Sequence, residues 1–120
     1  MRKITLVLLV CALSACSAGV RPDAQWDAYR EQVSRDEQAG VFSASEAQAR
    51  LREGWVRIYG QDPAMMGYFA YSETLLRSAE HGLIPMADAK ELVKEHERAA
   101  RAEYQNSRRR QVVEGPEYDL

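Results

Sequence analysis

The sequence has few of the residues from which catalytic and metal sites are built. Its 120 residues include only two cysteines and two histidines, His81 and His96. Neither the C-x-x-C nor the H-x-x-x-H spacing occurs, and a metal site needs three or four converging ligands. No serine lies in a Gly-x-Ser-x-Gly turn. We therefore expect no metal, no cofactor and no enzymatic activity.

Long apolar runs and an excess of basic charge are also missing. The longest apolar stretch runs over ten residues, from Ile4 to Leu13, whereas a membrane-spanning helix needs about 20. The 16 Lys and Arg residues are outnumbered by 18 Asp and Glu residues, which argues against a nucleic-acid partner. No segment alternates apolar and polar residues as a half-buried strand does.

The first seventeen residues have the pattern of a cleaved leader. Arg2 and Lys3 precede the apolar run, and Leu13-Ser14-Ala15-Cys16 ends it. This stretch resembles the signal peptide and lipobox of a bacterial lipoprotein precursor. The resemblance implies cleavage before Cys16, a diacylglyceryl group on its sulfur and an acyl chain such as palmitate on its new amine. The alternative is an ordinary secretory leader that is cut after Ala18.

The same resemblance implies a location in the cell envelope. Ser17 stands where aspartate favours retention in the inner membrane, so we expect an outer-membrane anchor facing the periplasm, with sorting between the two membranes left open. Two or more acyl chains hold a protein on a membrane stably. Cys11 would leave with the leader and Cys16 would carry lipid, so the mature chain would have no disulfide.

The chain after the leader, residues 16–120, is long enough for one domain. We expect a leader over residues 1–15, the lipidated cysteine and a tether over 16–22, a helical domain over 23–113 and a flexible tail over 114–120. Ser43 and Glu46 have the spacing of a capping box, and Asp62-Pro63 and Pro85 favour helix starts. Helix stops are expected at Gly40, Gly60 and Gly82.

This punctuation predicts an all-α fold, a small antiparallel bundle of about four helices. Gly54 lies inside the second helix, where it should cost about 1 kcal/mol relative to alanine. Apolar residues at helical spacing predict the buried faces: Trp26, Tyr29 and Val33; Ala47, Leu51, Trp55 and Ile58; Met65, Phe69, Leu76 and Ala79, with Tyr68 and Leu75 beside them; Ala89, Leu92 or Val93, His96, Ala99 or Ala100, and Tyr104.

An internal match relates the two halves of the chain. Residues 29–53 align without gaps to residues 71–95, an offset of 42, with identities that include the glycines of both turns. Each glycine is followed by an apolar pair, Val41-Phe42 and Leu83-Ile84, which we expect to be tucked beneath its turn. The match indicates two helical hairpins related by a repeat, or two unrelated hairpins that share only the residues that start and stop their helices.

Two groups of residues are candidates for contact with a partner. Aromatic and methionine side chains around the second connection make good contact anchors, and equally good core: Tyr59, Met66, Tyr68 and Tyr71. One member of each adjacent pair, Met65-Met66 and Tyr68-Phe69, should lie off the buried face. The second group is Arg108, Arg109 and Arg110, which suits an anionic surface or, alternatively, the negative end of a helix dipole.

These observations predict a non-catalytic, membrane-anchored envelope lipoprotein whose helical domain binds an envelope protein or the cell wall. A rival hypothesis is an immunity or exclusion-type lipoprotein that binds a foreign effector. The weakest is an envelope enzyme acting on glycan or lipid, for which Glu73 is the least implausible carboxylate.

Overall fold

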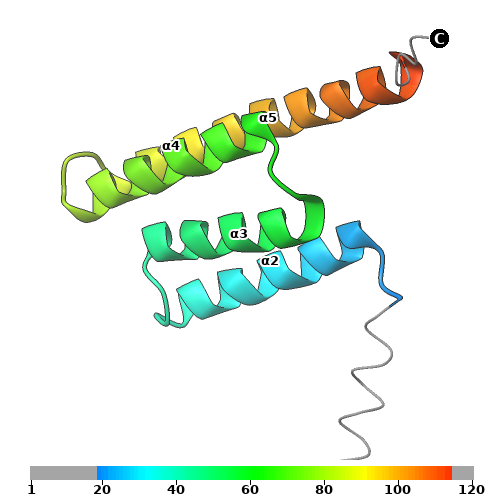
Figure 1. The fold of residues 1–120 in the computed structure, drawn as a ribbon. Coiled ribbons are helices and arrows are strands. Elements are labelled where there is room, and N and C mark those ends of the chain that lie inside the picture. The colour runs from blue at the N-terminus through cyan, green and yellow to red at the C-terminus, as the bar shows by residue number, and fades with distance from the viewer. Residues whose placement is uncertain (1–18, 115–120) are drawn as a thin grey trace, which may run out of the picture.

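The computed structural model describes residues 19–114, with side chains up to residue 112. This part of the chain forms four α-helices and no strand (Figure 1): α2 (Pro22–Gln38), α3 (Ala44–Tyr59), α4 (Pro63–Glu80) and α5 (Met86–Glu114). The predicted all-α bundle of four helices is confirmed. Cys16, the leader and residues 115–120 lie outside the described residues. No helix of the described part is both long and apolar enough to cross a membrane.

The two hairpin turns have the same hydrogen bonding. Gly40 has a φ of 80° and donates to Glu37 O, and Val41 donates to Asp36 O. At the offset of 42, Gly82 has a φ of 76° and the bonds run from Gly82 N to Ala79 O and from Leu83 N to Ser78 O. A positive φ suits glycine, because it has no Cβ. Both glycine stops are therefore confirmed as turns of one kind.

The helix starts also follow the sequence closely. The Ser43 hydroxyl accepts from Glu46 N at 3.3 Å and the Glu46 carboxylate accepts from Ser43 N, which completes the capping box. Asp62 accepts from the backbone of the third residue after it at 3.0 Å and caps α4. Helix α2 begins at Pro22, one residue earlier than expected, and α5 begins one residue after Pro85.

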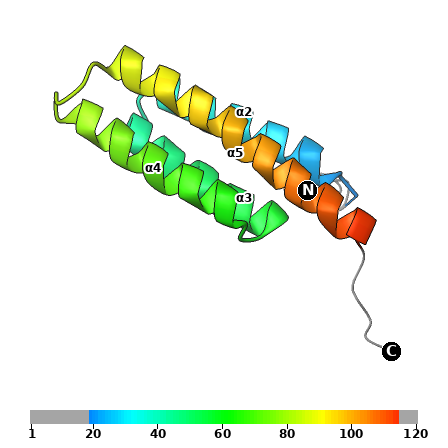
Figure 2. The same ribbon diagram turned by 90° about the horizontal axis from the view of Figure 1, so that it is seen from above.

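The helices form two antiparallel hairpins, α2–α3 and α4–α5, stacked so that α3 packs on α4 (Figure 1). Both turns lie at one end of the molecule. The start of α2 and the far part of α5, which runs beyond the other helices, lie at the opposite end (Figures 1 and 2). Consecutive helices pack together, but no Cα atoms of α2 and α5 approach within 8 Å. The bundle therefore has one open side.

The core is aromatic at one end and aliphatic at the other. The aromatic end holds Trp26, Trp55, Met65, Tyr68 and Phe69, with Tyr104 packed against it. The aliphatic end, nearer the turns, is built on Leu76, Ala79 and Ala89.

Gly54 has a packing role in addition to its local cost. A Cβ at Gly54 would lie 2.2 Å from the ring of Tyr29 on α2, because that ring lies directly on the glycine. The Tyr29 hydroxyl donates to Arg50 O at 2.7 Å, which holds the ring in this position. The glycine thus lets α2 approach α3 closely.

Three expectations about side chains were wrong. Tyr68 and Phe69 are both buried, because α4 faces neighbours on two sides and buries a wide arc. His96 is exposed and stacks on Tyr71, with ring centroids 4.0 Å apart, so it is not on the buried face of α5. That face runs instead through Ala89, Val93, Glu97, Ala100 and Tyr104.

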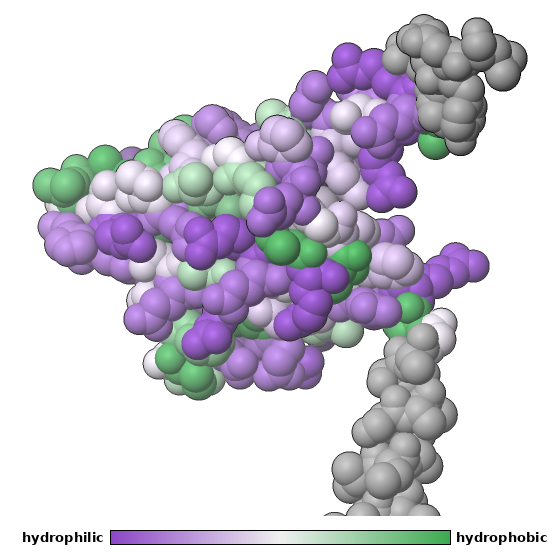
Figure 3. Space-filling view, viewed as in Figure 1, coloured by the Kyte–Doolittle hydropathy of each residue, from purple (hydrophilic) through white to green (hydrophobic). Residues whose placement is uncertain are grey.

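The third error concerns the apolar residues after the turn glycines. Val41 is 61% exposed and Leu83 is 75% exposed, whereas Phe42 and Ile84 are half-buried. In such a turn the apolar residue usually packs on the residue five positions before it, which here is Asp36 or Ser78. With no apolar partner, both tips face solvent, and hydrophobic atoms gather at the turn end (Figure 3).

Candidate ligand-binding cleft

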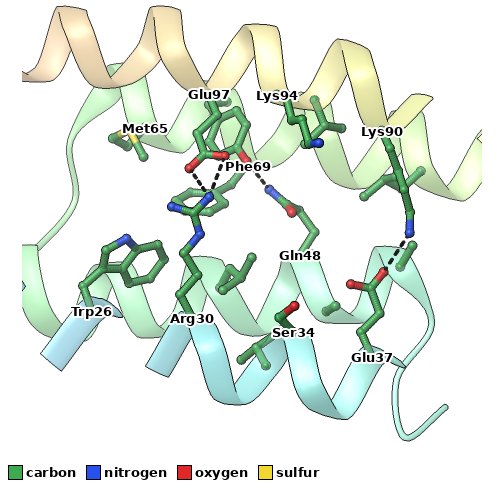
Figure 4. Close-up of a pocket in the computed structure, with 17 residues that line it drawn as sticks. Trp26, Arg30, Ser34, Glu37, Gln48, Met65, Phe69, Lys90, Lys94 and Glu97 are labelled. Carbon is green, nitrogen blue, oxygen red and sulfur yellow. Dashed lines mark hydrogen bonds and ion pairs between the residues drawn. The ribbon is translucent and has the colours of Figure 1, made fainter. Parts of the chain in front are cut away.

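The open side between α2 and α5 is a cleft that reaches the interior of the bundle (Figure 4). Its cavity has a volume of about 260 Å³, slightly below the usual range of small-molecule pockets. All four helices line it, and its inner wall is mostly apolar: Trp26, Val33, Ala44, Ala47, Leu51, Met65, Phe69, Leu76 and Val93. The cleft therefore offers an apolar chamber to a small ligand.

Two ion pairs cross the mouth of the cleft. Arg30 of α2 lies 3.1 Å from Glu97 of α5, and Lys90 of α5 lies 3.7 Å from Glu37 of α2 (Figure 4). Glu97 also lies 3.7 Å from Arg101. Long side chains make these bridges, so the two helices are joined while their backbones stay apart. Such partly exposed pairs contribute about 1 kcal/mol or less.

Two polar side chains lie inside the apolar chamber. Gln48, 5% exposed, donates from its amide nitrogen to the hydroxyl of Tyr68, 6% exposed, at 2.9 Å. The second amide N–H of Gln48 has no acceptor among the described residues, whereas the buried hydroxyl of Ser72, one turn along α4, lies beside the Tyr68 hydroxyl. Burial, and then the charge of Glu97, raise the pKa of Tyr68 to about 12. Tyr68 therefore keeps its proton and remains a hydrogen-bond donor.

Lys94 adds a third donor at the rim. Gln48 and Lys94 lie between the two ion pairs (Figure 4), and Lys94 makes no ion pair within the described part of the chain. The rim carries three cationic and two anionic side chains, so it has a small positive excess.

A second hollow of about 300 Å³ continues along the same side beyond Arg30 and Glu97. It is lined by two carboxylates and by the aromatic core: Asp23, Trp26, Asp27, Trp55, Tyr59, Arg101, Tyr104 and Gln105. The Tyr59 hydroxyl donates to Asp23, and burial together with this carboxylate raises the pKa of Tyr59.

The aromatic rings of this region are packed against one another. Trp26 and Trp55 meet at right angles with centroids 5.3 Å apart, and Trp55 meets Tyr104 in the same way at 5.2 Å. The indole N–H groups of both tryptophans have no acceptor among the described residues.

The four residues predicted as a partner surface do not form one exposed patch. Tyr68 is buried in the cleft, and Tyr59 lies in the second hollow against Trp55 and Asp23. Met66 packs on the core, and Tyr71 is exposed beside His96. The expected surface is therefore divided between the interior and separate places outside.

Two of the three arginines have a partner on α5, and the third has none among the described side chains. Arg108 donates to the Tyr104 hydroxyl at 2.7 Å, and this hydrogen bond raises the pKa of Arg108. Arg110 lies 3.1 Å from Glu103. Arg109 makes no hydrogen bond or ion pair within residues 19–112. The last turn of α5, which ends at Glu114, contains no basic residue. Because the dipole acts within the last turn, it does not explain the arginines.

The remaining chemical candidates lie in ordinary structural contacts. Glu73 forms an ion pair with Arg52 at 3.0 Å, and a ring nitrogen of His81 lies 2.7 Å from Arg77 O at the end of α4. Within the described residues, no three His, Cys, Asp or Glu side chains are close enough to hold a metal ion.

The cleft residues were missed although the sequence held a signal for them. Gln48 lies at helical spacing between Ala44 and Leu51, within the apolar face of α3. Glu97 has the same position between Val93 and Ala100 on α5. A polar residue on an apolar face indicates either a buried polar contact or an opening, and here both occur.

Comparisons of this chain with protein-family models, with curated proteins and with solved structures gave no match.

Proposed function

We propose that the chain is a non-catalytic lipoprotein of the bacterial cell envelope, anchored through Cys16 in the outer membrane and facing the periplasm. The observation that carries this proposal is the sequence Leu13-Ser14-Ala15-Cys16 after a short basic and apolar leader. The helical domain is the part that binds another envelope component, a protein or the cell wall.

The position of the domain relative to Cys16 supports this proposal. Helix α2 begins at Pro22, and six residues of extended chain reach at most about 20 Å. A lipid on Cys16 would hold the domain close to the membrane. Confinement to this thin layer raises the effective concentration of the domain for its neighbours, so anchoring is itself a contribution to binding.

The ends of the bundle would then differ in their surroundings. The start of α2 lies at the same end as the far part of α5, which carries Arg108, Arg109 and Arg110 (Figures 1 and 2). Anchored through Cys16, this basic end would lie nearest to anionic head groups, which attract such side chains. The exposed tips Val41 and Leu83 would face away from the membrane.

The anchor is tested by replacing its cysteine. Cys16→Ala should abolish metabolic labelling with a radioactive or clickable fatty acid and leave an unprocessed or soluble product. Cys11→Ala is the matched control and should be labelled and processed normally. Labelling of Cys16→Ala at the level of the unmodified protein would falsify the lipid anchor.

Partner binding is tested by photo-crosslinking in cells that make the native protein. Photoreactive residues at Val41, Tyr71 and Leu83 lie on exposed surface, whereas the same group at buried Tyr68 is the control. We expect a discrete adduct from an exposed site and none from Tyr68. A resident envelope partner supports the proposal, a foreign effector supports the immunity hypothesis, and no adduct at any exposed site contradicts partner binding by these surfaces.

A further inference from the structure

The cleft between α2 and α5 combines features that define the chemistry of one class of ligand. Its wall is apolar, its volume is about 260 Å³, and three hydrogen-bond donors line it, two of them buried inside and one at the rim. These donors are the Tyr68 hydroxyl, the second N–H of Gln48 and the ammonium of Lys94. Their convergence calls for an acceptor group, and the positive excess at the rim favours an anionic one.

We propose that this cleft binds an unbranched, medium-chain aliphatic carboxylic acid. Its carboxylate lies at Tyr68, Gln48 and Lys94, and its alkyl chain lies among Val33, Leu51, Met65, Phe69, Leu76 and Val93. The proposal does not depend on the lipid anchor, and it assigns the cleft a free acid rather than an acyl chain of a membrane lipid.

The buried position of Gln48 and Tyr68 is the strongest support. Both are more than nine-tenths buried, and the second amide N–H of Gln48 has no acceptor among the described residues, while the Tyr68 hydroxyl has only the neutral Ser72 hydroxyl beside it. A buried donor without an acceptor is unfavourable, and a carboxylate would remove that loss for Gln48 and offer Tyr68 a charged acceptor in place of a neutral one. Because burial holds the pKa of Tyr68 at about 12, its hydroxyl is available as a donor at neutral pH.

The anionic residues of the cleft do not oppose a bound carboxylate strongly. Glu97 is held by Arg30 at 3.1 Å and Arg101 at 3.7 Å, and Glu37 is held by Lys90 at 3.7 Å. Lys94 is the rim cation that remains without an ion pair in the described part of the chain. An incoming anion therefore meets one available positive charge and two neutralised negative ones.

The volume of the cavity limits the length of the chain. About 260 Å³ corresponds to roughly eight or nine water molecules at about 30 Å³ each. Each methylene that enters the cavity should strengthen binding about fourfold, from about 0.8 kcal/mol per buried CH₂. Once the cavity is full, further methylenes remain in solvent and add nothing.

Calorimetric titration with a series of carboxylates tests the proposal. The protein is the full chain carrying Cys16→Ala, so no acyl group on the chain competes for the cleft. From butanoate to octanoate, we expect the dissociation constant to fall about fourfold per methylene and then to level off between octanoate and dodecanoate. Decanol, which has the chain without the charge, should bind at least about tenfold more weakly than decanoate.

Single-residue variants distinguish binding at the carboxylate site from nonspecific association. Tyr68→Phe should weaken decanoate binding about tenfold or more, as expected for a hydrogen bond to a charged group, and Lys94→Gln by up to about fivefold. Arg98→Gln is the charge-matched control one turn along α5, outside the cleft, and should leave binding unchanged. Lys94 and Arg98 are exposed, so both of their variants should fold, as circular dichroism would check.

Three results would overturn the proposal. The first is equal binding of decanol and decanoate. The second is affinity that keeps rising beyond dodecanoate, as nonspecific association does. The third is an equal loss from Lys94→Gln and Arg98→Gln. None of them bears on the lipid anchor, which is decided separately by labelling of Cys16→Ala.

Discussion

The side of the bundle between α3 and α4 is closed, whereas the side between α2 and α5 is open. The offset of 42 that matches residues 29–53 to residues 71–95, continued along the same helices, nevertheless pairs the positions of the two sides. Helix α4 buries Met65, Phe69, Ser72 and Leu76 in the core, where three of them also form the inner wall of the cleft. The equivalent positions on α2 hold Asp23, Asp27, Arg30 and Ser34, all of which line the open side.

The facing helices differ in the same direction. Trp55 of α3 is buried in the core, and its equivalent on α5 is Glu97, which pairs with Arg30 across the mouth of the cleft. Burying an aromatic ring brings two helices together, whereas a charged residue at that position keeps access to water. The comparison teaches that a few polar residues in the seam suffice to turn a packed interface into a cleft.

One ion pair of the closed side has no counterpart at the equivalent positions of the open side, although two other pairs cross the mouth of the cleft. On the closed side Arg52 pairs with Glu73 at 3.0 Å. The equivalent residues on the open side are Lys94 and Glu31, and no ion pair joins them. Lys94 is thus left available at the rim because the pairing of the closed side has no counterpart there.

The largest expected effect comes from removing a side chain that α4 buries in the core. Phe69→Ala removes a ring that is 1% exposed and packs against Trp55, so we expect a loss of about 3–5 kcal/mol in the free energy of unfolding. The equivalent change on the open side, Asp27→Ala, should stay within about 0.5 kcal/mol. Urea unfolding followed by circular dichroism measures both. A loss above 1 kcal/mol for Asp27→Ala would show that the open side is packed.

Two glycine substitutions test how strongly the close packing of two helices depends on a residue without a side chain. Gly54→Ala places a Cβ 2.2 Å from the Tyr29 ring, so the ring must move and its bond to Arg50 O is lost. We expect a net loss of about 1–3 kcal/mol in unfolding free energy, despite the better helix propensity of alanine. Thermal unfolding gives the sign directly.

Gly67 of α4 provides the control for this substitution. No atom of the described residues lies within 4 Å of a Cβ built there, and the site is exposed. Gly67→Ala should therefore stabilise the protein by up to about 1 kcal/mol. Equal effects of the two substitutions would mean that Tyr29 does not restrict position 54.

The fold was predictable because its signals are local. The capping box at Ser43 and the glycine stops at Gly40 and Gly82 depend only on nearby residues, and all three formed as expected. The open side was not predictable, since it depends on how Arg30 and Glu97, 67 residues apart, meet across two helices. The buried faces fixed which helices pack, but only the assembled bundle shows which pair stays apart.

Closing the open side with apolar side chains should raise the free energy of unfolding by about 1 kcal/mol or more. Arg30→Leu combined with Glu97→Leu replaces a partly buried ion pair by apolar side chains, an exchange that is often neutral or stabilising. Each single substitution leaves one charge without this partner, so each should be less stable than the double variant. Unfolding of all four proteins gives the coupling between the two positions. A double variant less stable than both single variants would contradict this account.

The smallest effect concerns a partly buried contact that the closed side has and the open side lacks. Glu80 of α4 accepts from the backbone N–H of Ser45 at 2.8 Å and from its hydroxyl at 2.7 Å, whereas the equivalent residues Gln38 and Ala87 form no such pair. Desolvation works to raise the pKa of Glu80, but these hydrogen bonds outweigh it and lower the pKa below 4.5.

A carboxyl whose pKa is lower in the folded state stabilises the protein above its unfolded pKa, and this stabilisation is lost as pH falls through the folded pKa. Glu80→Gln should therefore be less stable than the unmodified protein at pH 7, and the difference should shrink as pH falls below about 4.5. Urea unfolding at a series of pH values measures the difference, and a constant gap between pH 7 and pH 3 would show that the charge of Glu80 does not hold α4 to α3.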